Sequence, residues 1–156
     1  MITRKLGAAA LLIAAFTATA SAEERGYSAT LCNGSSSATN LFYTFRGVEV
    51  TGLSSQTVQC GAAPEVGANV DRIEATVYDR NADADLCCTM MVLSADGMPI
   101  TSATRCSTGS ATASQLLSAT FPPNAAGAVD LSCNIPASNP RSGPSRIATY
   151  RVRSTP

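Results

Sequence analysis

Histidine and tryptophan are absent from this 156-residue chain, and its only lysine is Lys5. Without histidine, neither a Ser-His-Asp triad nor a Cys-His nucleophile pair can be built. Without a lysine beyond residue 5, the rest of the chain has no Schiff-base or Ser-Lys chemistry. The lack of tryptophan also removes the largest flat ring for stacking on sugars, so tyrosines would have to serve instead. We therefore predict that the protein is not an enzyme, although a pair of carboxylates in one cleft would still permit hydrolysis.

The first 22 residues have the pattern of a secretory signal peptide. Arg4 and Lys5 precede an apolar run that ends at Phe16, and small residues follow up to Ala20-Ser21-Ala22. A charged start, a short apolar stretch and an A-x-A cleavage pattern are typical of export signals. The run is too short for a membrane-spanning helix, which needs about 20 residues. We predict a signal peptide over residues 1–22 and a single secreted or periplasmic domain over residues 23–156, with no membrane span.

Charge in the predicted domain is close to balanced. Its basic residues are all arginine, and the acidic residues slightly outnumber them, so the formal charge of the domain is about −2. Such a balance lacks the basic footprint of a nucleic-acid-binding protein, so no nucleic-acid partner is expected. For an exported domain the expected partner is an unknown extracellular protein or a glycan. Arg141, Arg146, Arg151 and Arg153 make the C-terminal end basic. These side chains would be solvated, or would meet an acidic partner or the acidic segment 71–85 of the same chain.

Cysteine usage predicts disulfides. An even number of cysteines in an exported chain is typical of a disulfide framework and argues against metal binding or thiol catalysis. The six are Cys32, Cys60, Cys87, Cys88, Cys106 and Cys133.

One pairing follows from a hairpin. Asp96-Gly97 is a strong two-residue turn signal, and strands folded about it place Cys87 opposite Cys106. With a two-residue turn this pair would occupy a wide, hydrogen-bonded position, so a bulge or a longer turn is expected beside Pro99. Cys88 points to the other face of the strand and needs another partner. Three connectivities remain for the other four cysteines, and we favour Cys60–Cys88 with Cys32–Cys133.

The pattern of apolar residues predicts an all-β fold. Short alternating runs separated by turn residues recur about every ten positions, and no long segment has the 3.6-residue period of a helix. We expect a two-sheet antiparallel sandwich held by disulfides, with about nine short strands and jelly-roll or immunoglobulin-like wiring. The expected strands cover residues 27–32, 41–50, 56–60, 73–78, 86–93, 100–106, 114–121, 128–133 and 147–152.

The loop after the expected strand 73–78, which has the clearest alternation of apolar and polar residues, is a candidate calcium site. Oxygen-bearing side chains at every second position resemble the opening of a calcium loop. Ala84 and Met90 stand where an EF-hand has its glycine and its bidentate glutamate, so the loop is not an EF-hand. The alternative is a polar loop whose side chains cap turns. The four candidate ligands are Asp79, Asn81, Asp83 and Asp85.

Aromatic residues cluster in the expected strand 41–50. There Tyr43 and Phe45 would share one face and Phe42 would lie on the other. One of these faces is expected to pack on the core, and the other would then carry an exposed ring for a ligand.

Four segments carry a family resemblance. In chain order they are Gln56-Thr57-Val58-Gln59-Cys60, Val77-Tyr78-Asp79-Arg80-Asn81, Leu131-Ser132-Cys133-Asn134-Ile135-Pro136 and Ser145-Arg146-Ile147-Ala148-Thr149-Tyr150-Arg151-Val152. Together they resemble a loose group of small, uncharacterised, exported bacterial β-domain proteins. The resemblance implies export and a β-domain, and it transfers no catalytic or binding residue.

These observations favour a secreted, non-catalytic binding or surface-structural protein of unknown ligand. One alternative is a carbohydrate-binding module with a calcium ion at its rim, which predicts exposed Tyr or Phe rings on one sheet face or at one loop end. Another is a secreted protein inhibitor or adhesion subunit, which predicts a disulfide-braced loop or an exposed edge strand.

Overall fold

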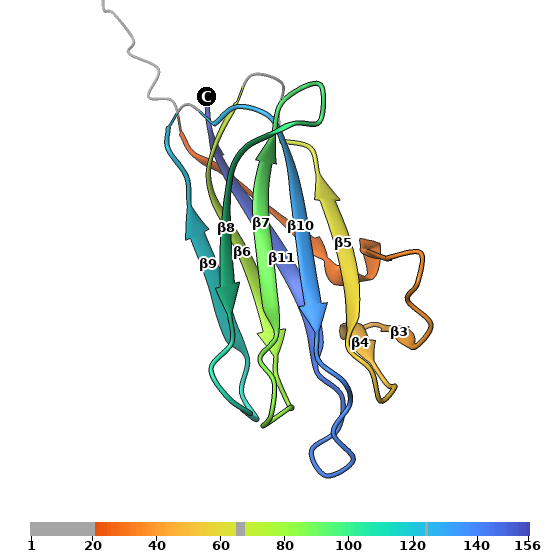
Figure 1. Ribbon diagram of the computed structural model, residues 1–156. Helices are drawn as coiled ribbons and strands as arrows, with labels where there is room; N and C mark the ends of the chain where they lie inside the picture. The colour runs from red at the N-terminus through yellow and green to blue at the C-terminus, as the bar shows by residue number, and fades with distance from the viewer. Residues whose placement is uncertain (1–20, 65–67, 124) are drawn as a thin grey trace, which may run out of the picture.

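The computed structural model describes residues 21–64, 68–123 and 125–156, which form two antiparallel β-sheets packed face to face (Figure 1). The predicted signal peptide lies outside the described residues, apart from Ser21 and Ala22, and stays a prediction. No helix within these ranges is long and apolar enough to cross a membrane. The elements in these ranges are β1 (Glu23–Ser28), the 3-10 helix η1 (Ala29–Leu31), β2 (Asn33–Gly34), β3 (Leu41–Thr44), β4 (Gly47–Val50), β5 (Gln56–Ala62), β6 (Asn69–Tyr78), β7 (Cys87–Leu93), β8 (Pro99–Cys106), β9 (Gln115–Thr120), β10 (Ala128–Ile135) and β11 (Arg146–Thr155).

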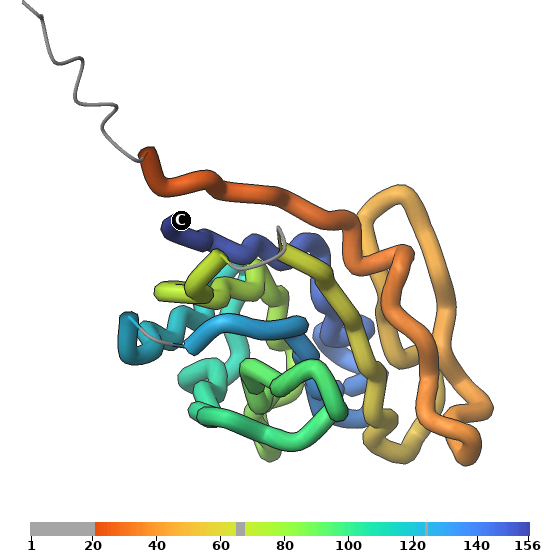
Figure 2. Tube along the Cα trace, turned by 90° about the horizontal axis from the view of Figure 1, so that it is seen from above, coloured from red at the N-terminus to blue at the C-terminus, as the bar shows by residue number. Residues whose placement is uncertain are grey.

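The strand order is that of a jelly roll. One sheet runs β3-β4-β11-β6-β9, with β1 also paired to β11, and the other runs β2-β5-β10-β7-β8. From β5 onward the chain changes sheet at every connection except the β7–β8 hairpin. In Figure 2 the N-terminal segment, in red and orange, runs beside the dark blue C-terminal strand where β1 pairs with β11. The predicted two-sheet sandwich is confirmed, and of the two wirings left open the structure has the jelly roll.

Alternation along β6 shows why these residues form strands. Ile73, Ala75 and Val77 are fully buried between the sheets, whereas the residues between them lie half-buried on the outer face. Full burial of a Val or Ile side chain contributes about 1.5–3 kcal/mol. The six-stranded sheet therefore has one apolar face and one polar face, and the polar face carries the site described below.

The expected single strand over residues 41–50 is wrong. β3 and β4 instead form a hairpin with Phe45-Arg46 as its turn. Gly47 adopts φ +118°, which is open to glycine and strained for other residues. The Thr44 hydroxyl accepts a hydrogen bond of 3.1 Å from the Arg46 N–H. Phe45 consequently lies at the tip of a hairpin, with 92% of its surface exposed, and not on a strand face.

The expected strand 27–32 also ends early. β1 stops at Ser28, whose hydroxyl accepts a hydrogen bond from the Thr30 N–H and caps η1. The turn that η1 makes sends the chain to the other sheet, where Asn33 in β2 pairs with Gln59 in β5.

All six cysteines form disulfides, in the pairs Cys32–Cys60, Cys87–Cys106 and Cys88–Cys133. The predicted Cys87–Cys106 bond is confirmed, and the favoured pairs Cys60–Cys88 and Cys32–Cys133 are wrong. The reason is that β10 lies between β5 and β7, so Cys133 stands directly opposite Cys88 and Cys60 stands opposite Leu131. Cys32, which precedes β2, reaches Cys60 from the other edge of β5. Three disulfides indicate an oxidising compartment outside the cytoplasm.

The β7–β8 hairpin has the irregularity that the sequence predicts. Its register holds from Cys87–Cys106 to Val92–Thr101 and then shifts, so that Leu93 pairs with Pro99. The Ser94 N–H donates to the Met98 carbonyl at 2.8 Å across the turn. The connection is therefore a longer, bulged turn.

Tyr150 connects the two sheets through the core. Its ring stacks on Tyr27 with centroids 5.0 Å apart, and its hydroxyl donates a hydrogen bond of 2.8 Å to the Gly61 carbonyl in the opposite sheet. Burial, and to a lesser degree the neighbouring Tyr27, raises the pKa of Tyr150. The folded protein thus holds the Tyr150 proton more tightly than the unfolded chain does.

This raised pKa makes stability sensitive to alkali. The contribution of Tyr150 is complete below the unfolded-state pKa of about 10 and is lost as pH rises through the higher folded-state value. Tyr150→Phe should lower the free energy of unfolding at neutral pH by about 1–2 kcal/mol, because the Gly61 carbonyl loses its donor. The variant should then lose less stability than the wild type as the solution becomes alkaline. Urea unfolding across this range measures both effects, and parallel alkaline declines would contradict the assignment.

Candidate functional site

A groove of about 400 Å³ opens on the outer face of the six-stranded sheet. It lies where β11 changes its neighbour, because β11 pairs with β4 through Arg146 and Ile147 and with β1 from Thr149 onward. Ala148, between these two ladders, is also where the register of β11 against β6 shifts. The lining residues come from four separate parts of the chain: Ser28, Phe45, Arg46, Tyr78, Arg146, Ala148 and Thr149.

Two aromatic rings of the groove are each in contact with the guanidinium group of an arginine. The Arg146 guanidinium carbon lies 4.0 Å from the centroid of the Tyr78 ring, and that of Arg46 lies 5.2 Å from the Phe45 centroid. Cation–π contacts of this kind contribute about 0.5–2 kcal/mol. The groove therefore combines two ring surfaces with two positive charges.

Gly47 allows the hairpin to sit against β11. A Cβ atom at this position would lie 1.9 Å from the Ile147 carbonyl oxygen and 2.8 Å from the Ala148 Cα. Only glycine combines this close approach with the positive φ. The Phe45 ring and the Arg46 charge thus reach the groove because residue 47 has no side chain.

A cross-strand row extends the groove to the sheet edge. Phe42 pairs with Glu49, Glu49 with Arg146, and Arg146 with Tyr78, across β3, β4, β11 and β6. Directly opposed residues point to the same face of a sheet, so the half-exposed Phe42 ring lies beyond Glu49 on the outer face. Phe42 and Tyr43 point to opposite faces, as predicted, and the Tyr43 hydroxyl accepts a hydrogen bond from the Gly34 N–H.

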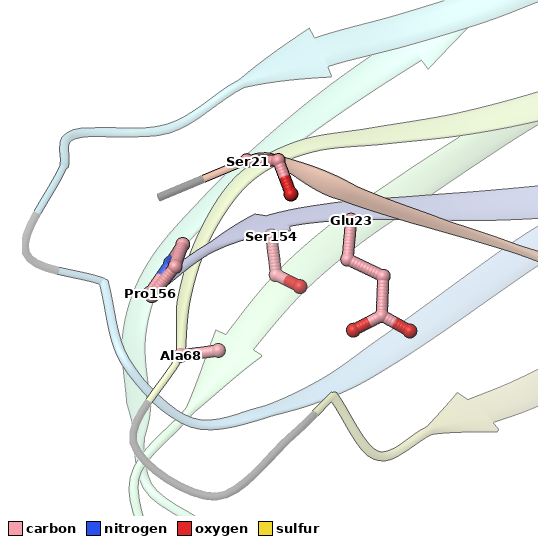
Figure 3. Close-up of a pocket in the computed structure, with 5 residues that line it drawn as sticks. All are labelled: Ser21, Glu23, Ala68, Ser154 and Pro156. Carbon is pink, nitrogen blue, oxygen red and sulfur yellow. The ribbon is translucent and has the colours of Figure 1, made fainter. Parts of the chain in front are cut away.

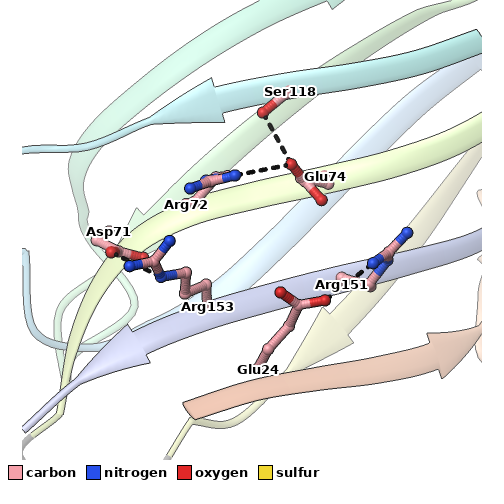
Figure 4. A network of polar contacts seen from close by, with 7 residues as sticks. All are labelled: Glu24, Asp71, Arg72, Glu74, Ser118, Arg151 and Arg153. Atoms are coloured by element: carbon pink, nitrogen blue, oxygen red, sulfur yellow. Dashed lines mark hydrogen bonds and ion pairs between the residues drawn. The ribbon is translucent and has the colours of Figure 1, made fainter. Parts of the chain in front are cut away.

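Farther along this face, the arginines are neutralised. Arg151 lies 2.9 Å from Glu24, Arg153 lies 3.3 Å from Asp71, and Arg72 lies 3.4 Å from Glu74 (Figure 4). The hydrogen bond to Glu24, and then the charge of Glu24, raises the pKa of Arg151. Of the alternatives given for the basic C-terminal end, pairing with segment 71–85 is present for Arg153, whereas Arg151 pairs with Glu24, outside that segment.

A second, smaller hollow lies near the C-terminus (Figure 3). Its volume is about 70 Å³, and it is lined by Ser21, Glu23, Ala68, Ser154 and Pro156. The Glu23 carboxylate already accepts a hydrogen bond of 2.6 Å from Arg25 Nε. This hollow is too small for a sugar ring, so it is not the candidate site.

The outer face of the other sheet carries a row of polar residues. Gln59, Ser132, Thr89 and Thr104 lie in one row across β5, β10, β7 and β8. Burial raises the pKa of Asp130 on the same face. The four strands contain no aromatic residue, which leaves this face without a ring for stacking.

Asp79, the first predicted calcium ligand, is buried in a network of protein donors. Its Oδ1 accepts hydrogen bonds of 3.0 Å from the Asn81 N–H and from the Ser145 hydroxyl. Its Oδ2 accepts from the Leu86 N–H and from the Ser107 hydroxyl. These donors lie next to β6, β7, β8 and β11, so the carboxylate ties strand ends of both sheets together.

The other predicted ligands do not converge on Asp79. The Asn81 side chain donates to the Ala137 carbonyl and accepts from the Asp83 N–H. Asp85 accepts from the Gly109 N–H. Within the described ranges, no three acidic, Cys or His side chains are placed to share one ion. The described residues thus show no preformed cluster of ligands at this loop, and calcium binding stays a prediction.

Comparisons with known proteins support the fold. No protein-family model and no curated protein matches the sequence. Among solved structures, a family two carbohydrate esterase from Cellvibrio japonicus is similar, with a TM-score of 0.53 at 8% identity over 87% of this chain and 36% of that chain. The enzymatically active domain of tailspike protein 4 from bacteriophage CBA120 is similar with a TM-score of 0.50 at 6% identity, over 83% of this chain and 19% of that chain. The carbohydrate-binding module CBM36, in complex with calcium and xylotriose, has a TM-score of 0.49 at 12% identity, over 82% of this chain and 98% of that chain.

At such low sequence identities, these similarities concern the fold alone. The chain spans only 36% of the esterase and 19% of the tailspike chain. Fold and site together define a disulfide-bonded jelly-roll domain with an arginine- and aromatic-lined groove on one sheet.

Most residues of the groove were not predicted as site residues from the sequence. Arg146 counted there only as part of a basic C-terminal end, Tyr78 only as one of the tyrosines that could stack on a sugar, and Arg46 had no assigned role. The available signal was Gly47 directly after Phe45-Arg46, since a glycine inside an apparent strand often marks a turn or a close backbone approach.

Proposed function

We propose that this chain is a non-catalytic glycan-binding domain of an exported protein, secreted or periplasmic, and that the groove is its binding site. The observation that carries the proposal is the pair of rings, Phe45 and Tyr78, beside a groove that also presents the hydroxyls of Ser28 and Thr149. The similar solved structures add support for the fold only.

The chemistry of the groove suits a sugar. The C–H faces of a pyranose are apolar and stack on aromatic rings, while its hydroxyl groups need polar partners at the rim. Phe45 is 92% exposed, and such an exposed large ring contributes nothing to the core. A ligand that covers it would remove apolar surface from water.

The lining also favours binding over hydrolysis. Carboxylate-dependent hydrolysis needs two acidic side chains in one cleft. Within the described part of the chain, the groove is lined by arginine, aromatic, hydroxyl and alanine side chains. Together with the lack of histidine in the whole sequence, this supports a role without catalysis.

Phe45→Ala tests the proposal. We expect the variant to bind about tenfold more weakly to the polysaccharide that the wild type selects from a panel of soluble polysaccharides. Affinity electrophoresis followed by titration calorimetry measures the change. Because Phe45 is almost fully exposed, the unfolding midpoint of the Phe45→Ala variant should equal that of the wild type.

Leu53→Ala is the matched control, since Leu53 is 86% exposed and does not line the groove. It should bind as the wild type does. Equal affinities for Phe45→Ala and the wild type, or no binding of the wild type to any polysaccharide, would refute the proposal.

A further inference from the structure

We infer that the ligand of this groove is an acidic glycan, and that Arg146 binds the carboxylate of a uronic acid residue with Arg46 as a second positive charge. The inference rests on the proposed function and adds the chemical class of the sugar. It comes from the two guanidinium groups and not from the rings.

The first step is that, among the described residues, neither groove arginine forms an ion pair. On the same face Arg72, Arg151 and Arg153 each lie within 3.4 Å of a carboxylate. Within the described ranges no ion pair joins Arg46 or Arg146 to an acid. The face therefore has a neutralised region, shown in Figure 4, and a region with uncompensated positive charge.

The second step is that Arg146 lies against a ring, and within the described residues no hydrogen bond from its side chain to an acceptor is found. The guanidinium carbon lies over the Tyr78 ring, 4.0 Å from its centroid, which restricts the movement of the group. The Nε atom is buried and has no hydrogen-bond partner in the described structure, so we assign the contact with a ligand to the two terminal nitrogens. A guanidinium is a planar fork that binds a carboxylate with two parallel hydrogen bonds. Orientation by a ring prepares such a fork for a ligand, because little side-chain entropy is left to lose on binding.

The third step concerns Glu49, which faces the same side. Glu49 stands opposite Arg146 across the β4–β11 ladder, and no ion pair joins the two in the described structure. Two guanidinium groups against one carboxylate leave the groove positive, in a predicted domain whose formal charge is about −2. Glu49 should then weaken the binding of an anion, and its removal should strengthen that binding.

A sugar acid fits this combination better than an acidic peptide does. The groove presents ring surfaces and hydroxyls beside the charges, and a uronic acid residue carries a C–H face, hydroxyl groups and a carboxylate on one ring. A single binding position can thus use the exposed Phe45 ring, Arg146 and Thr149 together, while Tyr78 supports Arg146.

The test compares one glycan with and without its charge. The probes are an oligogalacturonide and its fully methyl-esterified form, titrated calorimetrically into the full chain produced in an oxidising compartment. We expect the wild type to bind the acid at least about tenfold more tightly than the ester. Arg146→Gln should abolish this preference. Arg146→Lys, which keeps the charge without the planar fork, should retain only part of it.

Two further variants sharpen the test. Glu49→Gln should tighten binding of the acid about threefold and leave binding of the ester unchanged. Arg151→Gln removes a charge on the same face that is already paired with Glu24, and it should keep the wild-type preference. Circular dichroism and unfolding midpoints establish that each variant is folded.

The outcomes separate this inference from the proposed function. Equal binding of acid and ester, or a preference of the wild type for neutral polysaccharides, would overturn the acidic-glycan inference and leave glycan binding standing. Failure of the wild type to bind any glycan, acidic or neutral, would overturn both. A preference for the acid that survives Arg146→Gln would overturn the assignment to Arg146.

Discussion

Asp79→Ala should lower the free energy of unfolding by about 3–5 kcal/mol, the largest effect that we expect from any single substitution in this chain. The carboxylate is fully buried and accepts hydrogen bonds from two backbone N–H groups and two hydroxyls. Hydrogen bonds to a charged group each contribute about 1.5–3 kcal/mol, and an unsatisfied buried donor adds its own desolvation penalty. Alanine would leave all four donors without this acceptor.

The position of Asp79 makes the loss global. Its donors belong to residues next to β7, β8 and β11, and Asp79 itself follows β6. The Ala111 N–H also bonds to its carbonyl. Loosening this network should therefore free the ends of strands in both sheets, and unfolding should remain a single cooperative transition at a lower denaturant concentration.

Guanidinium chloride unfolding, followed by circular dichroism, measures the change. Asp83→Ala is the matched control because Asp83 is an exposed acid of the same loop, and it should change stability by no more than about 0.5 kcal/mol. A loss below about 1 kcal/mol for Asp79→Ala would show that the network is not structural.

Gly47→Ala should have the second largest effect, a loss of about 2–4 kcal/mol. The added Cβ would lie 1.9 Å from the Ile147 carbonyl oxygen, and the backbone at φ +118° is unfavourable for alanine. Backbone atoms of β4 and β11 cannot give way as a flexible side chain can. The hairpin must therefore move away from β11, and the Phe45-Arg46 turn moves with it.

Gly47→Ala should consequently lose both stability and ligand affinity. Thermal unfolding and calorimetric titration with the selected glycan measure the two losses. Gly143→Ala is the control for conformation alone, since Gly143 has φ +86° and open space around its Cβ position. It should cost about 1–2 kcal/mol and leave affinity unchanged. Wild-type affinity in Gly47→Ala would show that the hairpin does not form the binding site.

Local patterns in the sequence were enough to predict several elements. The alternation of Ile73, Ala75 and Val77 gives both the strand and its buried face, because side chains alternate along any β-strand. Asp96-Gly97 predicts the β7–β8 hairpin and, through its register, the Cys87–Cys106 bond. Each of these inferences depends on residues that are close together in the chain.

Local reasoning failed where a distant strand intervenes. Cys60 and Cys88 do not pair because β10 separates their strands. The segment 41–50 alternates like one strand, and its division into two follows from the contact between Gly47 and β11. The structural role of Asp79 was not predicted, because two of its donors, Ser107 and Ser145, lie far away in sequence.

By itself, then, the sequence determined the all-β class, the disulfide chemistry and the lack of histidine-dependent catalysis, because these depend on composition and on short periodic patterns. Only the tertiary structure decided the jelly-roll wiring, two of the three disulfides and the groove. The groove brings together Ser28, the turn Phe45-Arg46, Tyr78 and the start of β11. These segments meet because β11 pairs with β1, β4 and β6 at one place, and no short-range pattern specifies which strands become neighbours.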